Sequence, residues 1–115
     1  LGPDLALVSA FPYLRSDEFG SSPFLLGSLT RPDDDHASHV RVAEGILPPR
    51  GMLLLASDAL SAWLLRRAER GEPVWEAVSP LGIADAADFE ALVEAAREDG
   101  ARNDDMTLVR IVPRP

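Results

Sequence analysis

Apolar residues along this chain repeat with two different periods, and the shorter one predicts strands at residues 5–11, 40–47, 52–57 and 106–112. Short runs of this kind, rich in Leu, Ile and Val, are typical of buried or half-buried strands. The two prolines at 48–51 cannot lie within a central strand. We therefore expect a tight turn there and a hairpin of segments 40–47 and 52–57.

The longer period, about 3.6 residues, predicts helices in the second half of the chain. Residues 57–71 form an amphipathic segment that ends at a glycine after several basic residues, which suits a helix C-terminus. Residues 85–100 form a second amphipathic segment, in which Asp85 is placed to cap the helix with Asp88 at capping-box spacing. Residues 73–79 favour one or two further helical turns.

The remaining segments are predicted to be connections. Residues 13–28 mix turn residues with Phe and Leu, which favours an irregular segment with a hydrophobic underside, whereas 29–39 is typical of a mobile surface loop. The order strand, long loop, hairpin, helix, helix, strand predicts an α+β class with mainly antiparallel sheets and helices on one face. With 115 residues, the chain is long enough for one small domain.

Composition narrows the function classes. A net charge of -8 disfavours nucleic acid and membrane surfaces as partners. The absence of cysteine excludes disulfides and thiolate chemistry, and no apolar run approaches the length of a membrane span. All 11 basic residues are Arg, which suggests a GC-rich, bacterial genome. We expect a cytoplasmic protein. Because the sequence starts at Leu1 almost directly on a strand pattern, we also expect the chain to be a piece of a longer one.

Acidic residues stand at the ends of two predicted strands. Asp58 follows the strand at 52–57, and Asp104 and Asp105 precede the strand at 106–112. If these strands are antiparallel neighbours, Asp58 and Asp104 meet at one edge of the sheet. Paired carboxylates are hard oxygen ligands suited to Mg²⁺ or Mn²⁺.

Structural interpretations of the same residues stay open. Ser57 or Asp58 is well placed as an ordinary helix N-cap. Asp104 and Asp105, which follow Ala-Arg-Asn, are also typical of a solvated turn.

The stretch "MLLLASDALSAWL", followed about 45 residues later by "RNDDMTLVRI", resembles the C-terminal part of the protein phosphatase 2C family, in its bacterial branch. In that family, an apolar strand ends in a turn whose Asp binds metal, and a later Asp-Asn pair followed by a hydroxyl residue opens the final strand. Asp58 and Asp104 match the two metal ligands. Asp105 stands at the Asn position and Thr107 at the hydroxyl. The segment 10–28 is also similar to the family.

The resemblance implies a metal-dependent Ser/Thr phosphatase with an α-β-β-α sandwich fold and two Mg²⁺ or Mn²⁺ ions. The chain departs from the family in two ways. Ala59 replaces a usual Gly, and the N-terminal half, with its acidic cluster, Asp-Gly motif and phosphate-binding Arg, has no counterpart in residues 1–115. We therefore expect a single partial domain, inactive alone, in which no catalytic residue can be assigned.

The parent protein would act on phosphoprotein substrates in signalling. The missing N-terminal part, or another chain, would cover the exposed sheet. The rival hypothesis is a non-catalytic, phosphatase-like binding or sensing module, which the alanine at position 59 slightly favours.

Other chemistry-bearing residues receive structural interpretations. The stretch "DDDHASH" at 33–39 contains acids and a His-x-x-His pair, but Pro32 favours a solvated loop over a metal site. Arg66, Arg67 and Arg70 complement a helix C-terminus. Trp63 and Trp75 are expected to be core or interface anchors rather than stacking platforms.

Overall fold

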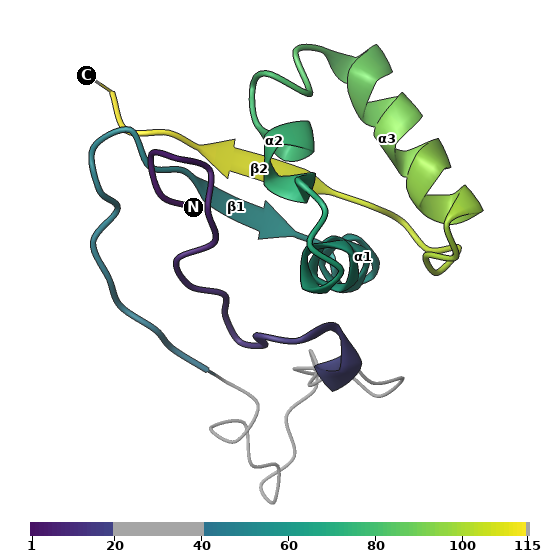
Figure 1. Cartoon of the computed structure of the whole chain (residues 1–115), viewed down its shortest axis with the longest axis horizontal. Coiled ribbons are helices and arrows are strands. Elements are labelled where there is room, and N and C mark those ends of the chain that lie inside the picture. Colours follow the sequence, from purple (N-terminus) through teal and green to yellow (C-terminus); the bar gives the residue numbers. More distant parts are fainter. Residues whose placement is uncertain (20–40, 115) are drawn as a thin grey trace, which may run out of the picture.

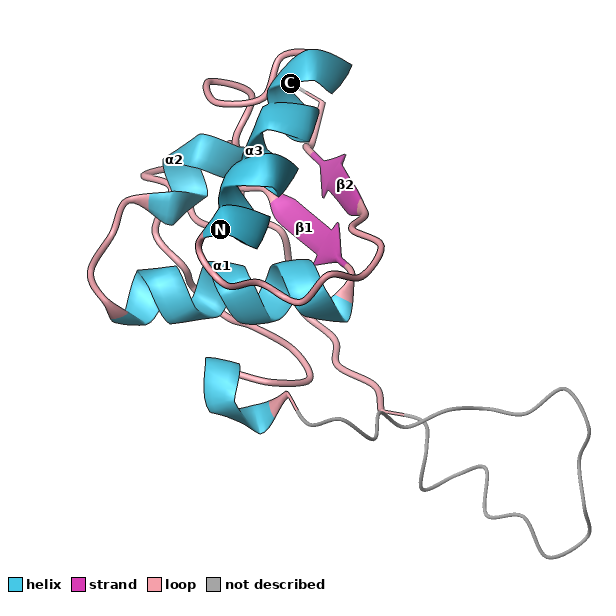
Figure 2. Ribbon diagram, turned by 90° about the vertical axis from the view of Figure 1, so that its right-hand side faces the viewer, coloured by secondary structure: helices cyan, strands magenta, loops and turns pink. Residues whose placement is uncertain are grey.

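The computed structural model describes residues 1–19 and 41–114. The elements, in chain order, are the 3₁₀ helix η1 (Ser16–Glu18), strand β1 (Leu53–Ala56), helices α1 (Asp58–Glu69), α2 (Val74–Val78) and α3 (Ala86–Glu98), and strand β2 (Leu108–Ile111). The α+β class predicted from the sequence is confirmed. Figure 2 shows the helices on one side of the strands.

The two strands form an antiparallel ladder in which Leu53 pairs with Ile111 and Ala56 pairs with Leu108. The neighbours predicted from segments 52–57 and 106–112 are therefore confirmed, although each strand is shorter than its apolar run. Figure 1 shows β1 and β2 running in opposite directions beside the helices.

The helix side of this ladder carries the core. Leu54, Ala56 and Leu108 pack against a buried cluster drawn from the three helices and the segments between them. Its members are Leu60, Trp63, Leu64, Val74, Val78, Ile83 and Ala96. Since alternate residues of a strand point to opposite faces, Leu53, Leu55, Val109 and Ile111 point away from the helices.

That second face of the ladder is apolar and exposed. Leu53, Leu55, Val109 and Ile111 lie on it with exposed fractions of 46%, 51%, 45% and 44%. The pairs Leu53–Ile111 and Leu55–Val109 are directly opposite each other, so these four side chains form one patch, called here the bare sheet face. A patch of this kind on a small domain marks a surface that normally packs against something.

Arg110 is the exception on the helix side of β2. Its Nη1 donates to the carbonyl oxygen of Ile83 at 2.8 Å and to that of Val78 at 3.4 Å. These carbonyls lie at and just beyond the C-terminus of α2, where a cation is electrostatically favoured. The charged side chain thus joins β2 to the segment that follows α2.

Local sequence signals explain the helix ends. The Asp85 carboxylate accepts a hydrogen bond from the Asp88 N–H at 2.9 Å, as the predicted cap requires. Gly71 and Gly100 follow α1 and α3 with φ angles of 78° and 89°. These angles lie in the left-handed region where glycine has no steric penalty.

The predicted strand at 5–11 is wrong. The N–H of Gly2 donates to the carbonyl of Ala6 at 2.9 Å, and Leu5 has a φ of 60°, so the chain turns there. Val8 is 73% exposed. Within the described segments no strand lies alongside 5–11, and an apolar run without a neighbouring strand has no ladder to join.

The predicted hairpin is also wrong. Residues 41–47, the described part of the segment 40–47, form no strand beside β1. Val42 and Ile46 are 76% and 95% exposed, so the alternating pattern has no core surface to cover. The turn predicted at 48–51 is present, with the Gly51 N–H donating to the Pro48 carbonyl at 2.9 Å.

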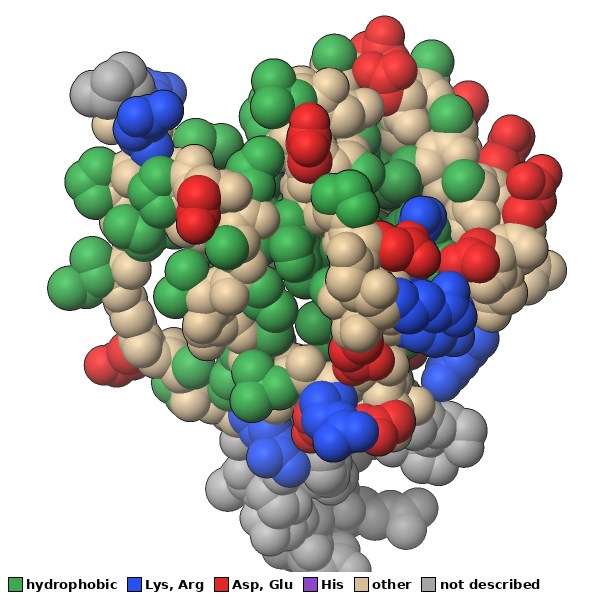
Figure 3. Space-filling model, viewed as in Figure 1, with side chains coloured by type: hydrophobic (Ala, Val, Ile, Leu, Met, Phe, Trp, Pro, Cys, Tyr) green, Lys and Arg blue, Asp and Glu red, His purple; other side chains and the backbone are tan. Residues whose placement is uncertain are grey.

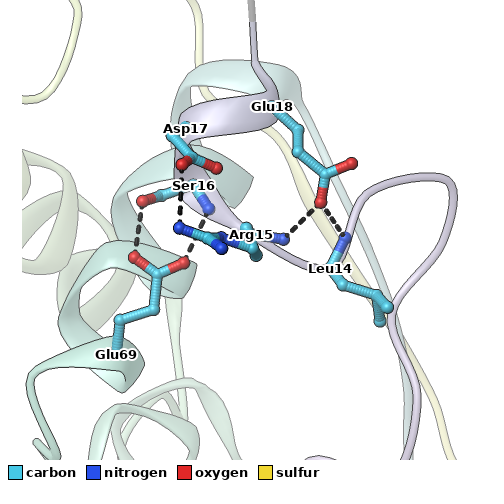
Figure 4. Close-up of polar contacts among 6 residues, drawn as sticks. All are labelled: Leu14, Arg15, Ser16, Asp17, Glu18 and Glu69. Atoms are coloured by element: carbon cyan, nitrogen blue, oxygen red, sulfur yellow. Dashed lines mark hydrogen bonds and ion pairs between the residues drawn. The ribbon is translucent and has the colours of Figure 1, made fainter.

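The segment that contains η1 is attached to the C-terminus of α1 by one carboxylate (Figure 4). Glu69 accepts hydrogen bonds from the Ser16 N–H at 2.7 Å and from the Ser16 hydroxyl at 2.6 Å. The Ser16 hydroxyl is the main cause of a lowered pKa of Glu69, and the Ser16 N–H adds to the effect.

We expect the contact between Ser16 and Glu69 to depend on pH. A carboxyl whose pKa is depressed by folding stabilises the fold above its ordinary value of 4.5, and the contribution is lost as pH falls through the lowered pKa. A carbon-13 NMR titration of the Glu69 carboxyl should give a midpoint below 4.5 that Ser16→Ala raises. The exposed Ser9→Ala is the control. An unchanged midpoint in Ser16→Ala would contradict this assignment.

Candidate metal centre

The end of the ladder nearest α1 is where the predicted site residues lie. The Ser57 N–H donates to the Thr107 carbonyl at 3.0 Å, and the Thr107 N–H donates to the Ser57 hydroxyl at 3.0 Å. These bonds extend the antiparallel pairing one residue beyond β1 and β2. They place the start of α1 next to the turn that leads into β2.

Asp58 is the first residue of α1, directly after the pairing ends. Its Oδ1 accepts a hydrogen bond from the Ala59 N–H at 2.8 Å, and its Oδ2 lies 3.9 Å from Nη1 of Arg102. The side chain is 46% exposed. Ala59 is helical and buried, so the position that is usually Gly in the resembled family uses no left-handed backbone here.

Asp104 lies in the turn that precedes β2. Its N–H donates to the Arg102 carbonyl at 2.9 Å, and its Oδ1 accepts from the Asp105 N–H at 2.8 Å. From α3, Arg97 Nη2 donates to the Asp104 carbonyl at 3.3 Å. Because Arg102 touches Asp58 and also belongs to this turn, Asp58 reaches the segment that carries Asp104.

The structure thus brings the Asp58 end of β1 and the Asp104–Asp105 turn to one end of the ladder, as the antiparallel prediction requires. The Asp105 N–H donates to the Asp104 carboxylate, so the side chain that orders this turn is that of Asp104 rather than that of Asp105. Thr107 contributes its backbone to the ladder through Ser57. The roles of Asp58 and Asp104 as metal ligands stay predictions.

The donor set suits a hard cation only in part. Asp58 and Asp104 are carboxylates of the kind Mg²⁺ and Mn²⁺ prefer. However, the part of the chain that the structure describes contains no group of three or more His, Cys, Asp or Glu side chains placed to hold a metal ion. The guanidinium of Arg102 also faces the Asp58 carboxylate. A complete coordination shell would need ligands from outside residues 1–19 and 41–114.

A tryptophan fixes the position of the turn. Trp63 on α1 is 1% exposed, and its Nε1 donates to Oδ2 of Asp99 at 2.9 Å. Asp99 caps the end of α3, and Arg70 lies 3.8 Å from the same oxygen. These contacts tie α1 to the start of the 99–107 connection that carries Asp104.

The other candidate residues from the sequence that lie in the described part of the chain make structural contacts. Arg67 is paired with Glu72, and its guanidinium lies 4.9 Å from the Trp63 ring centroid. Trp63 is a core anchor, as predicted. The stretch 33–39 lies outside the described residues.

A shallow depression lies away from the ladder end. Asp4, Leu5, Pro73, Trp75 and Glu76 line it, and its volume is about 150 Å³. Small-molecule sites usually measure roughly 300–1,000 Å³. The depression is small by that standard, and its two carboxylates disfavour phosphate. Acidic side chains also gather over α3 on the face shown in Figure 3.

Sequence reasoning missed Ser57 and Arg102. The Ser57 hydroxyl links two segments that are 50 residues apart in the sequence. The only sequence signal for it is its position at a strand-to-helix junction, which indicates a helix N-cap. It has the extended backbone of an N-cap, but its hydroxyl makes no cap hydrogen bond.

No protein-family model matches the chain, and neither a curated protein nor a solved structure matches it significantly. Among the helices in the described ranges, none is long and apolar enough to cross a membrane.

Proposed function

We propose that this chain is the C-terminal part of a phosphatase 2C-like domain, which in complete form hydrolyses phospho-Ser and phospho-Thr. One observation carries the proposal. The antiparallel register of β1 and β2 brings Asp58 and the Asp104 turn to the same end of the ladder. The resemblance to the phosphatase 2C family requires this placement. The placement depends on the pairing of two segments that are about 50 residues apart in the sequence.

Asp58 and Asp104 would contribute to a site for two Mg²⁺ or Mn²⁺ ions. Asp105 and Thr107 would support it through their backbone N–H groups, which donate to Asp104 and to Ser57. In the complete domain, such a metal pair would supply an activated water for attack on phosphorus. The described residues offer two of the required carboxylates and no group of three. The chain alone is therefore proposed to be inactive.

The bare sheet face fits the same proposal. In an α-β-β-α sandwich the inner face of each sheet packs on the other sheet. Leu53, Leu55, Val109 and Ile111 present such a face, and the helices cover the opposite side. We propose that the missing N-terminal part or another chain covers it, in a bacterial, cytoplasmic signalling protein acting on phosphoproteins.

One observation favours the alternative, a non-catalytic binding or sensing module. Nη1 of Arg102 lies 3.9 Å from the Asp58 carboxylate. A guanidinium at that position balances the charge that a metal ion would otherwise balance.

The test is a Mn²⁺ titration of the isolated chain followed by electron paramagnetic resonance. If Asp58 and Asp104 share an ion, Asp58→Asn or Asp104→Asn should weaken Mn²⁺ binding at least about tenfold, because each removes one ligand charge. The matched control is Glu94→Gln. It removes one charge from an exposed position of α3 and should leave the affinity unchanged.

Equal Mn²⁺ affinity in both Asp variants and in the control would contradict the shared site and favour the binding module. In the same preparations, p-nitrophenyl phosphate should stay intact with and without Mn²⁺. Turnover that requires Mn²⁺ and disappears in Asp58→Ala would show that the chain is a complete enzyme rather than a part.

A further inference from the structure

The N-terminus is paired to β1 in a way that continues the sheet. The Leu1 amino group donates to the Met52 carbonyl at 2.6 Å, and the Met52 N–H donates to the Leu1 carbonyl at 3.0 Å. Two residues that exchange both hydrogen bonds are the signature of an antiparallel ladder. Figure 1 shows the N-terminus beside the start of β1.

This pair lies on the edge of β1 that faces away from β2. The Ser57 N–H points to β2, where it donates to Thr107. Backbone groups of a strand alternate between its two edges. Leu53 and Leu55 therefore also point their N–H and C=O to β2, whereas Met52, Leu54 and Ala56 point theirs to the outer edge.

Among residues 1–19 and 41–114, no strand pairs with the outer edge of β1 beyond Met52. The Ala56 carbonyl accepts the Ser61 hydroxyl at 3.2 Å. No hydrogen bond from another described segment reaches the N–H or C=O of Leu54. The chain after Leu1 cannot fill this edge, because in the antiparallel pairing of Leu1 with Met52 it runs towards Gly51 and away from Leu54. An open edge of this kind accepts an added strand.

We propose that the outer edge of β1 docks a third strand, antiparallel to β1, formed by polypeptide joined to the amino group of Leu1. This inference rests on the proposed function, because both treat the chain as part of a larger sandwich. The Leu1–Met52 pair sets the register. The first residue ahead of Leu1 lies opposite Leu53, the second opposite Leu54 and the fourth opposite Ala56.

The register also predicts which residue types the added strand should contain. Its first and third residues share a face with Leu53 and Leu55, and so extend the bare sheet face. They should be apolar and β-branched. The second and fourth exchange hydrogen bonds with Leu54 and Ala56. A covalent link to Leu1 favours this occupant over a separate peptide, since it gives a high effective concentration at the edge.

The test is amide hydrogen exchange by NMR on the chain with Thr-Val-Thr-Val joined ahead of Leu1. In the 115-residue chain, the Leu54 amide should exchange faster than those of Leu53 and Leu55. The extension should slow it about tenfold, the effect of one net hydrogen bond. The matched control is Thr-Val-Pro-Val, in which proline lacks the N–H that would donate to the Leu54 carbonyl and so disrupts the ladder at this pair.

Unchanged exchange at Leu54, with Leu53 and Leu55 still protected in the extended chain, would overturn the proposal. Equal slowing by the free acetylated tetrapeptide would also overturn it, because the occupant would then be a separate strand. Neither readout involves Mn²⁺. A protected Leu54 together with failed Mn²⁺ binding would contradict the phosphatase proposal alone.

Discussion

The double substitution Leu55→Thr with Val109→Thr should turn the isolated chain from a self-associating protein into a monomer without loss of its fold. The two residues face each other across the ladder at the centre of the bare sheet face. Apolar area removed from water stabilises association by roughly 25 cal/mol per Å². Because threonine is β-branched, it keeps the strand preference while it adds a hydroxyl to the exposed face.

Light scattering measures the association, and tryptophan fluorescence reports the fold because Trp63 is 1% exposed in the core. The matched control is Ile46→Thr with Leu81→Thr. It makes the same kind of change at two apolar residues that are 95% and 79% exposed outside the bare sheet face. The control should associate like the unmodified chain.

The opposite result has a clear meaning. If the unmodified chain is a monodisperse monomer that unfolds cooperatively, it closes its own core without a second sheet. The proposal of a truncated phosphatase would then fail, and a self-contained binding domain would explain the protein better.

The helices and the central strand pair could be predicted because their signals are local or self-consistent. Residues 85–100 combine an apolar stripe with a capping Asp85 and a terminal glycine, and all of these features are present in α3. The short apolar runs at 52–57 and 106–112 are typical of buried strands, and β1 and β2 pair as expected.

The wrongly predicted strands at 5–11 and 40–47 show that an apolar run alone does not establish a strand. Each run has strand composition, yet Val8 and Ile46 are 73% and 95% exposed. A strand is stable only when another strand takes its backbone hydrogen bonds. No property of the run itself states whether that partner is present.

For the candidate site, the sequence predicted which strand ends meet but not the contacts that hold them together. The acids at two strand ends indicated a shared edge, and the pairing of the strands brings those ends together. The contacts that shape the edge come from Ser57 and Arg102, whose partners are 50 and 44 positions away in the chain. Neither has a spacing signal, so only the fold could identify them.

Trp63 should be the side chain whose loss costs the most stability. It is 1% exposed, is one of the largest fully buried side chains of the core and donates to Asp99 at 2.9 Å. Trp63→Ala should lower the free energy of unfolding by about 3–5 kcal/mol, the usual cost of removing a buried aromatic side chain. Small domains have roughly 5–15 kcal/mol in total, so this variant should lose a large share of its stability and unfold at a much lower urea concentration.

Trp63→Phe separates packing from the hydrogen bond. It keeps most of the ring volume but leaves the Asp99 carboxylate, which is 39% exposed, without its indole partner. We expect a loss of about 1 kcal/mol from the missing hydrogen bond, with some further loss from the smaller ring. Urea unfolding followed by circular dichroism measures both variants without relying on tryptophan fluorescence.

Trp75→Phe is the matched control, because Trp75 is only half-buried beside the core and lines the shallow depression. A loss in Trp63→Phe no larger than in Trp75→Phe would contradict the role of the indole N–H. The hydrogen bond also holds the end of α3 that leads to Asp104. If that bond orders the site, Trp63→Phe should therefore weaken Mn²⁺ binding as well as stability, while Trp75→Phe should leave Mn²⁺ binding unchanged.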